Sequence, residues 1–218
     1  MKTKRKALLL TFCAVLLVVA SVLGTIAYLT ANDKVTNTFT VGQVAINLDE
    51  AKVTEDGEAV TPAERVKANS YKLLPGHTYT KDPTVTVLKG SESSYIKMTV
   101  TFTKAKELDA IFAPNGANLT SIFKDYDSDY WIAKGNTENT DANTRTYEFW
   151  YKEAVDAPTT DVKLDALFDS ITVPNNITGK QLATIQGMMI TVNAYAIQAD
   201  GFETAAKAWD AFPKGTTP

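Results

Sequence analysis

A stretch of two-residue alternation near the middle of the chain limits most strongly what this sequence can fold into. A turn signal, Leu74-Pro75-Gly76, precedes Val85 and Val87, which alternate with threonines. After a second glycine-containing break, four more apolar residues recur at every other position: Ile96, Met98, Val100 and Phe102. Alternation at 180° per residue places these side chains on one face. The stretch therefore predicts two β-strands that supply half of a β-sandwich core, each buried side chain contributing roughly 1.5–3 kcal/mol before entropy is subtracted.

Three further segments extend the β pattern along the chain. The region 37–48 changes phase at Gly42, which indicates a bulge or a corner there. Thr146–Tyr151 alternates again, and Met188–Ile197 is the last strong strand. Val162–Val173 fits a strand and a helix equally well. Together these patterns predict a mainly β, antiparallel fold.

The region 104–143 breaks the two-residue period, so we expect an irregular or helical insertion there. Leu108, Ile111 and Phe112 indicate a short helix. Two further short elements are expected in this insertion, a helical turn at Leu119, Ile122 and Phe123 and a short strand at Tyr130-Trp131-Ile132. Near the end of the chain, apolar residues at helical spacing between Phe202 and Phe212 predict a last helix, with Asp200 and Glu203 as its capping pair.

The N-terminus has the features of a secretory signal peptide. Lys2 to Lys6 carry positive charge and Ala7 to Leu29 are uncharged and mostly apolar. Small residues before Tyr28 favour cleavage after Ala27, which leaves residues 28–218 as one mature β domain. An uncleaved anchor is the alternative, because about 20 apolar residues span a bilayer. The only cysteine, Cys13, lies within this segment, so the mature domain forms no disulfide.

The charge balance excludes one large class of partners. Four of the 22 basic residues lie in the first six positions, which leaves 18 basic against 25 acidic residues in the remainder. An acidic domain without a basic stripe does not favour nucleic acid. We expect contact with a membrane only through the signal peptide.

Catalytic residues are scarce in this sequence. His77 is the only histidine, whereas a zinc peptidase of the His-Glu-x-x-His type needs two imidazoles and a general base. No serine or cysteine is paired with a well-placed base. We interpret His77 as a turn residue and predict neither an enzyme nor a cofactor.

Two other groups of residues are candidate binding sites. Asp125, Asp127 and Asp129 have the spacing of half a calcium loop, but Tyr130 stands where that loop needs glycine and Asn136 where it needs a bidentate glutamate. They are weak calcium candidates, and a solvated loop is the alternative. The aromatic row Tyr147, Phe149, Trp150 and Tyr151 suits a core face better than a sugar-binding platform.

Several strings resemble one known family. Thr25–Thr30 followed by Asn37–Glu50 is similar to the start of the TasA/camelysin family, Leu74–Asp82 to its proline-glycine turn, and the segment around Ala194 to its closing strand. The resemblance implies a jelly-roll-like β-sandwich, secreted by a Gram-positive bacterium and processed by a SipW-type signal peptidase. It also implies assembly with itself and related matrix subunits into extracellular fibres. Camelysin-like proteins have been classed as metallopeptidases, and this chain departs from what that chemistry requires.

The resemblance also implies how copies associate: the mature N-terminal segment leaves its own sheet edge and completes the sheet of a neighbour. The apolar residues that would serve in this donor-strand exchange alternate on either side of Gly42, namely Phe39, Val41, Val44, Ile46 and Leu48. Two other functions stay open at this point. One is a monomeric secreted module that binds glycan or calcium, and the other is a camelysin-like metallopeptidase.

The first prediction concerns processing. The secreted protein should begin at or near Tyr28 and carry no lipid, because the charged start, the apolar run and the small residues form a signal peptide. Intact-mass spectrometry of secreted protein measures this directly. A mass that retains residues 1–27, or one increased by acyl chains at Cys13, contradicts the prediction.

Overall fold

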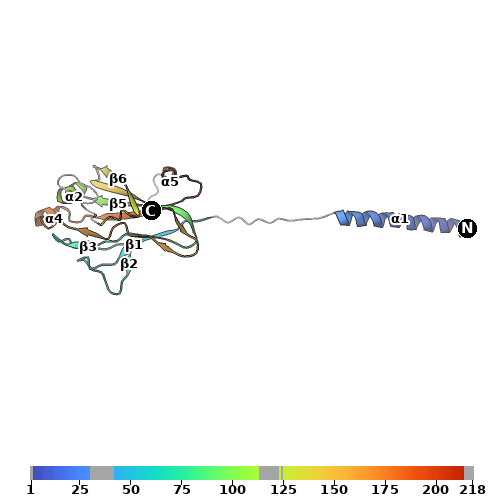
Figure 1. Ribbon diagram of the computed structural model, residues 1–218, viewed down its shortest axis with the longest axis horizontal. Coiled ribbons are helices and arrows are strands. Elements are labelled where there is room, and N and C mark those ends of the chain that lie inside the picture. Colours follow the sequence, from blue (N-terminus) through green and yellow to red (C-terminus); the bar gives the residue numbers. More distant parts are fainter. Residues whose placement is uncertain (1, 30–41, 113–122, 124, 214–218) are drawn as a thin grey trace. The chain divides into compact units, whose positions relative to one another are not determined.

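The computed structural model describes residues 2–29, 42–112, 123 and 125–213, and the chain divides into two units after Val41 (Figure 1). The first unit holds helix α1 (Lys2–Leu29). The second, Gly42–Pro218, holds every strand that the structure describes. Among the residues that the structure describes, no helix combines the length and apolarity needed to cross a membrane.

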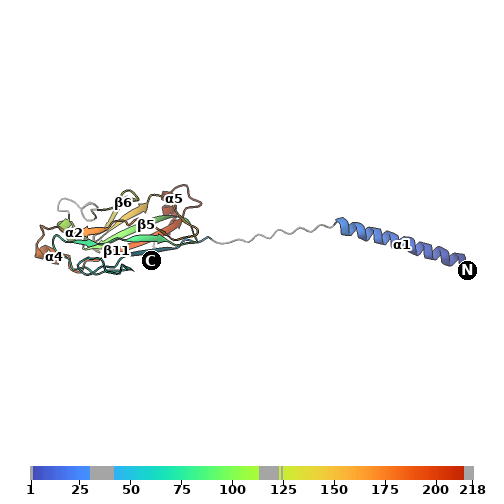
Figure 2. The same cartoon turned by 60° about the horizontal axis from the view of Figure 1, so that its bottom comes forward.

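The second unit is mainly β, with three antiparallel sheets (Figures 1 and 2). The five-stranded sheet has the path β11 (Ile190–Gln198), β5 (Ser91–Thr103), β7 (Thr144–Tyr151), β6 (Trp131–Asn139), and β8 (Val155–Ala157) pairs with β5 off this path. The four-stranded sheet has the order β2 (Arg65–Val66), β1 (Ile46–Ala51), β4 (Thr84–Val87), β9 (Val162–Lys163). The third sheet pairs β3 (Thr78–Thr80) with β10 (Ser170–Thr172).

The alternating stretch forms the centre of this fold, as predicted. β4 and β5 are joined by a turn in which Gly90 has a φ of 82°, a conformation that glycine adopts without strain. The predicted core face of β5 is fully buried, with exposed fractions of 0% for Ile96, Met98 and Val100 and 2% for Phe102. Val85 and Val87 of β4 are equally buried, and both sheets contribute side chains to one continuous core.

Short helices lie between and after the strands. Helix α2 (Ala105–Phe112) confirms the predicted helix after β5. Asn143 holds its start by accepting hydrogen bonds from the Ala105 and Lys106 amides, both at 3.1 Å. Arg145 of β7 then donates to both carboxylate oxygens of Asp109, at 2.5 and 2.7 Å, which fastens the helix to the sheet.

The C-terminal helix α5 (Ala205–Ala211) confirms the last predicted helix, but the predicted capping pair is wrong. Thr204 is the N-cap and accepts a hydrogen bond from the Lys207 amide, because the chain reaches the helix only after the turn that contains Gly201. The helix is held against the outer face of the five-stranded sheet by Lys97. The Lys97 ammonium lies 4.5 Å from the Trp209 ring centroid and 5.2 Å from that of Phe212.

One further prediction needs correction, one alternative that the sequence left open is resolved, one expected element is largely undescribed, and one helix was not predicted. Val162–Val173 forms two short strands, β9 and β10, rather than a helix. The insertion 104–143 is more regular than predicted, because β6 continues the sheet for nine residues beside β7. Of the expected helical turn in this insertion, Leu119 and Ile122 lie outside the described residues and Phe123 is fully buried. Helix α4 (Gly179–Thr184) was not predicted. Thr178 and Gln181 form a reciprocal capping box at its start, and this pair is a recognisable sequence pattern for a helix N-terminus.

The second prediction tests the core. Replacing Met98 by alanine should lower the free energy of unfolding by about 2–5 kcal/mol, since the side chain is fully buried between the sheets and leaves a cavity. Thr99→Ala is the matched control, because the Thr99 side chain lies on the opposite face of the same strand. Urea unfolding of both variants measures the difference. Equal losses would contradict the one-sided burial of β5.

Candidate functional site: an apolar groove beside an unpaired strand edge

One edge of the five-stranded sheet is left unpaired. β11 pairs with β5 in an unbroken antiparallel register, and no second partner strand is found in the described part of the chain. The Thr103 amide donates to the Met189 carbonyl at 3.1 Å, and the Ala199 amide donates to the Ser93 carbonyl at 2.8 Å. Residues of an antiparallel strand point their backbone groups to alternate sides. The odd-numbered residues of β11 therefore bond to β5, and the even-numbered ones turn their N–H and C=O groups outward.

The same even-numbered residues carry the apolar side chains. Ile190, Val192 and Ala194 lie opposite Phe102, Val100 and Met98 in the register, so both rows face the core. The β5 row is 0–2% exposed. The β11 row packs against the core but is only half-buried. An apolar row and an unpaired edge thus coincide on β11, which leaves room beside it for one more strand.

β1 forms the other side of this space. The Leu88 amide donates to the Ala45 carbonyl at 2.9 Å, which by the same alternation turns the backbone groups of Ile46 and Leu48 away from β4. The Leu48 carbonyl accepts a hydrogen bond from the Lys67 ammonium at 2.5 Å. β1 and β11 are neighbours without being paired.

A groove of about 1150 Å³ lies between these two strands. Its apolar lining comes largely from β1, the segment 66–73, α4 and the residues after it, and β11; it includes Ile46, Leu48, Met188, Ile190, Val192 and Ala194. The volume exceeds the roughly 300–1,000 Å³ that is typical of small-molecule pockets. Its size, with backbone groups exposed along one wall, suits an extended peptide better than a compact ligand.

One wall of the groove is polar, and its charged and polar side chains already have ion-pair or hydrogen-bond partners within the domain. The Lys81 ammonium lies 2.5 Å from a carboxylate oxygen of Glu50, and both side chains are less than 10% exposed. Asn69 donates to the other oxygen of Glu50 at 2.9 Å and to the Ala51 carbonyl at 2.8 Å. Burial raises the pKa of Tyr71, the charge of Glu50 raises it further, and the neutral hydroxyl donates to the Thr80 carbonyl. Losing one partner of such a pair costs about 3–5 kcal/mol, so the wall is fixed in shape.

The predicted self-association residues fall on both sides of the division at Gly42. Phe39 and Val41 lie outside the described residues, and Ala27 and Tyr28 belong to the last turn of α1. Ile46 and Leu48 are strand residues of β1 that pack against the domain's own core and line the groove. Val44 precedes that strand and is half-buried. In this structure the three distal residues therefore belong to the β domain, and their part in an exchange stays a prediction.

His77 lies in the turn that the sequence predicted. Its amide donates to the Leu74 carbonyl, its carbonyl accepts from the Val173 amide at 2.9 Å, and its ring centroid is 5.1 Å from that of Tyr79. Gly76 beside it has a φ of 76°, as the turn requires. These contacts give His77 a structural position.

Two of the predicted calcium residues make hydrogen bonds that stabilise the local structure. Asp127 accepts hydrogen bonds from the Asp129 and Tyr130 amides and so caps the turn before β6, while Asp125 accepts one from the Ser170 hydroxyl at 2.6 Å. Within the described residues, no group of three or more histidine, cysteine or acidic side chains is arranged to hold a metal ion.

The aromatic row divides between the two faces of β7. Tyr147 and Phe149 are 1% and 0% exposed, which confirms the core-face interpretation for these two. Trp150 points to the outer face, where its ring centroid lies 6.3 Å from that of Trp209. Tyr151 stacks on Tyr130 with ring centroids 6.2 Å apart.

The groove was missed by sequence reasoning because it depends on which strands do not pair. The alternation in β11 predicted a strand, but nothing in those residues shows that its outer edge lacks a partner. No protein-family model, curated protein or solved structure matches the chain.

The third prediction concerns the acidic cluster near the predicted calcium residues. The Asp169 residue is exposed, and partial desolvation together with the charges of Asp125, Asp82 and Asp127 raises the pKa of its carboxyl, so water screens much of the effect. The folded protein then holds this proton more tightly than the unfolded chain, so stability falls as the pH rises above the ordinary pKa of 3.8. Asp169→Asn should raise the Tm at pH 7, and the gain should vanish at pH 3.

Thermal unfolding followed by circular dichroism at both pH values measures this effect. Asp141→Asn is the control, because Asp141 is equally exposed but is not among the charges that act on Asp169. A lower Tm for Asp169→Asn at pH 7 would show that the carboxylate stabilises the fold.

Proposed function

We propose that this chain is a secreted structural protein that polymerises by inserting the N-terminal segment of one copy into the groove of the next. The observation that carries the proposal is the half-buried apolar row on the unpaired edge of β11. An added strand would cover that row and bond to its outward N–H and C=O groups in one step. In this mode the backbone supplies affinity and alternate side chains supply specificity.

The occupant is the segment Tyr28–Val41, which precedes the β domain. Val35, Phe39 and Val41 share one phase of a two-residue period. If the segment pairs as a strand, these side chains point to the same face as Ile190, Val192 and Ala194. The segment is joined directly to Gly42, where the second unit begins, so it is tethered to the domain without being needed for the alternating core of β4 and β5.

The proposal extends to the fold, the family and the location of the protein. The three antiparallel sheets around one core are in keeping with a jelly-roll-like β-sandwich. We assign the chain to the TasA/camelysin family on its sequence motifs, with processing between Ala27 and Tyr28 by a SipW-type signal peptidase. Its place is then the extracellular matrix or surface of a Gram-positive bacterium, and its partners are further copies and related matrix subunits.

The proposal includes no catalytic role. His77 is the only imidazole, and it takes part in a turn. A catalytic zinc is ordinarily held by three protein ligands with histidine prominent among them. The chemistry of the groove is instead apolar, with backbone donors and acceptors along one wall.

The fourth prediction tests polymerisation. The mature protein, Tyr28–Pro218, should form fibres under the electron microscope, whereas the truncated protein Gly42–Pro218 should stay monomeric with an unchanged β-type circular dichroism spectrum. A synthetic peptide of Tyr28–Val41 should bind the truncated protein. Fibres of truncated protein would contradict the proposal, and unfolding on truncation would show that the segment is ordinary core.

A variant of the groove gives a second measure in the full mature protein. Val192→Lys places a charge in the apolar row and should abolish fibres. Gln198→Lys is the matched control, since Gln198 is exposed at the far end of the same strand and does not line the groove. Equal polymerisation of both variants would exclude this groove as the receiving site. A groove that instead holds a peptide of another protein would bind that peptide and yield no fibres.

A further inference from the structure

Three polar side chains from separate segments meet at one buried carboxylate. Glu50 lies in β1, Asn69 follows β2, and Lys81 lies between β3 and β4. The Lys81 ammonium donates to one carboxylate oxygen of Glu50 at 2.5 Å, and the side-chain nitrogen of Asn69 donates to the other at 2.9 Å. Glu50 therefore holds an amine and a carboxamide next to each other.

The burial of this ion pair is not accounted for by stability. Both charged side chains are less than 10% exposed, and an apolar pair of similar volume is often as stable in such a place or more stable. Ionisable groups that a protein keeps in surroundings of this kind are candidates for chemistry. The question is then which reaction an amine, a carboxylate and a carboxamide can carry out together.

The carboxamide of Asn69 is held in one orientation. Its oxygen accepts a hydrogen bond from the Val53 amide at 3.0 Å, and its nitrogen donates to the Ala51 carbonyl at 2.8 Å as well as to Glu50. The carbonyl is thus polarised by a backbone N–H group, the type of donor that stabilises an oxyanion. The nitrogen lies against the carboxylate that also contacts the amine.

We propose that Lys81 and Asn69 form an intramolecular isopeptide bond, with Glu50 as the catalytic acid and base. The proposal does not depend on the function proposed above. The reaction needs no oxidant, metal or cofactor, because all reacting groups belong to the chain. The bond joins the segment after β2 to the segment that leads into β4, and it gives a domain without cysteine a covalent crosslink.

The reaction begins with a proton transfer. The Lys81 ammonium gives one proton to Glu50, which leaves a neutral amine and a neutral acid in a site where burial disfavours charge. The lone pair of Nζ then forms a bond to Cγ of Asn69. The electron pair of the C=O bond moves to the oxygen, where the Val53 amide stabilises the negative charge.

Glu50 next exchanges protons between the two nitrogens. It donates its proton to the former amide nitrogen of Asn69 and takes one from the attacking nitrogen of Lys81. The bond between Cγ and the former amide nitrogen breaks, its electron pair leaves with ammonia, and the carbonyl re-forms. Glu50 finally gives its proton to the ammonia, which leaves as ammonium. One carboxamide and one ammonium group have then become one secondary amide and one ammonium ion.

A second lysine–asparagine contact serves as an internal comparison. The Lys67 ammonium donates to the side-chain oxygen of Asn47 at 2.5 Å, and the nitrogen of Asn47 donates to Asp49 at 2.6 Å. Lys67 is exposed, and it contacts the amide oxygen, so water stabilises its charged form. We expect no bond between Lys67 and Asn47.

Mass spectrometry of the mature protein tests the proposal. The intact mass should be lower than that of the sequence by one ammonia. Trypsin does not cleave after a lysine whose Nζ is acylated, so the digest should contain peptide 68–72 joined to peptide 73–89. A succinimide also forms with loss of ammonia, but it leaves these two peptides separate.

Variants identify the role of each group. Asn69→Ala removes the carboxamide while keeping the Lys81–Glu50 pair, and it should abolish the joined peptide. Glu50→Gln should leave most of the protein without the bond, since loss of a general acid and base slows a reaction by roughly 10²–10⁴-fold. Lys52→Arg is the matched control. Lys52 pairs with Glu64 at 2.7 Å on the exposed surface, so this variant should retain the joined peptide in full.

A digest of the mature protein in which peptides 68–72 and 73–89 stay separate overturns the proposal. So does a joined peptide formed with loss of water, because Glu50 would then be the group that acylates Lys81. Full crosslinking in Glu50→Gln overturns the catalytic role of Glu50. If circular dichroism shows that Glu50→Gln does not fold, the digests of the mature protein and of Asn69→Ala decide whether the bond exists.

Discussion

The outer edge of β11, which has no partner strand among the described residues, is the constraint on which the groove depends. A strand edge with free N–H and C=O groups is a template for another chain, and proteins usually protect it with charges, bulges or short length. The opposite edge of the same sheet is protected in this way: β6 shifts register between Ala133 and Gly135, carries Lys134 and Glu138, and exposes its side chains from Ile132 onward. β11 has an unbroken register and an apolar row. One sheet thus combines a protected edge with a receptive one.

The edge of β11 can pair with another strand only if the groove beside it stays open. The Glu50–Lys81 pair with Asn69 supports that space, because a satisfied ion pair at the wall cannot be packed against an apolar strand without losing partners. On the other side, Lys67 holds the Leu48 carbonyl and so shields part of β1. The strand that remains uncovered is β11, and the apolar floor of the groove is continuous with the domain core.

The sequence predicted well those elements whose pattern is local. The alternation of Ile96 to Phe102 correctly predicted a strand, and the spacing of Leu108 and Ile111 correctly predicted a helix. In both elements one face is buried, so apolar residues recur in the sequence with the period of that element. Prediction failed, or left alternatives open, where the deciding interaction is distant. β6 is held in a strand by β7 although its side chains are exposed, and Val162–Val173 divides into strands because Val162 pairs with Val87 and Ile171 with Tyr79. The groove, likewise, is defined by an absent pairing, which no single strand encodes.

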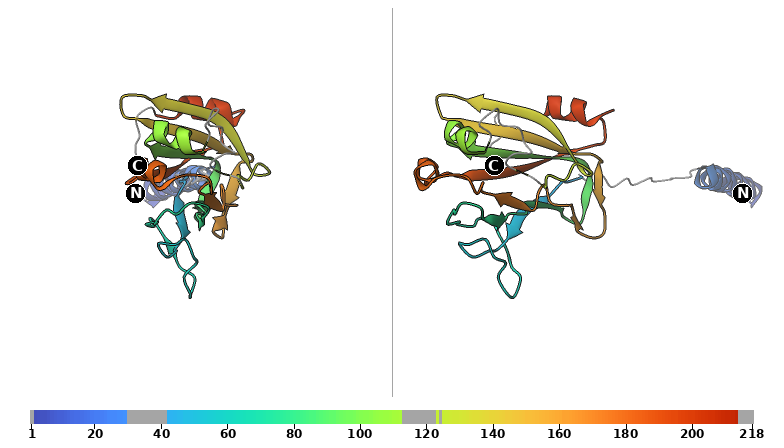
Figure 3. Two further views of the ribbon diagram at one scale, coloured as in Figure 1. Left: turned by 90° about the vertical axis from the view of Figure 1, so that its left-hand side faces the viewer. Right: turned by 60° about the vertical axis from the view of Figure 1, so that its left-hand side comes forward.

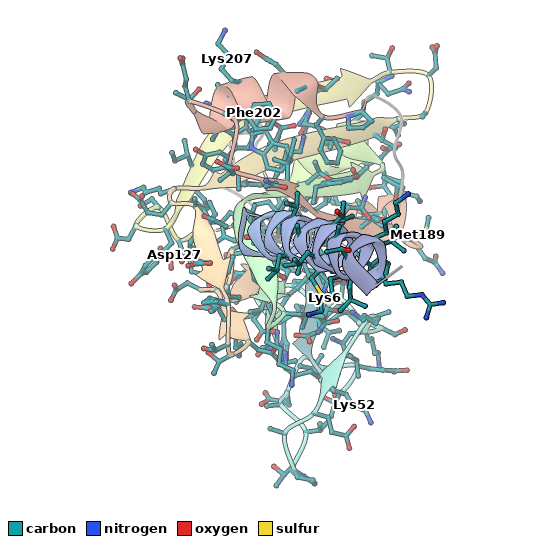
Figure 4. The ribbon with its side chains drawn as sticks, turned by 90° about the vertical axis from the view of Figure 1, so that its right-hand side faces the viewer. Lys6, Lys52, Asp127, Met189, Phe202 and Lys207 are labelled. Carbon is teal, nitrogen blue, oxygen red and sulfur yellow. The ribbon has the colours of Figure 1, made fainter. Side chains whose placement is uncertain are left out.

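The contacts of Lys97 with Trp209 and Phe212 determine where α5, and anything fused behind it, lies on the domain. Trp209 and Phe212 hold α5 on the outer face of the sheet. Figure 4, in which Phe202 and Lys207 are labelled, shows this helix on the side of the domain away from Lys52, and Figure 3 shows the same helix in two further views. The last described residues therefore lie clear of the groove. In the proposed filament, a reporter, enzyme or antigen fused behind α5 would be carried at every repeat, and the spacing of that cargo would be set by the length of one subunit.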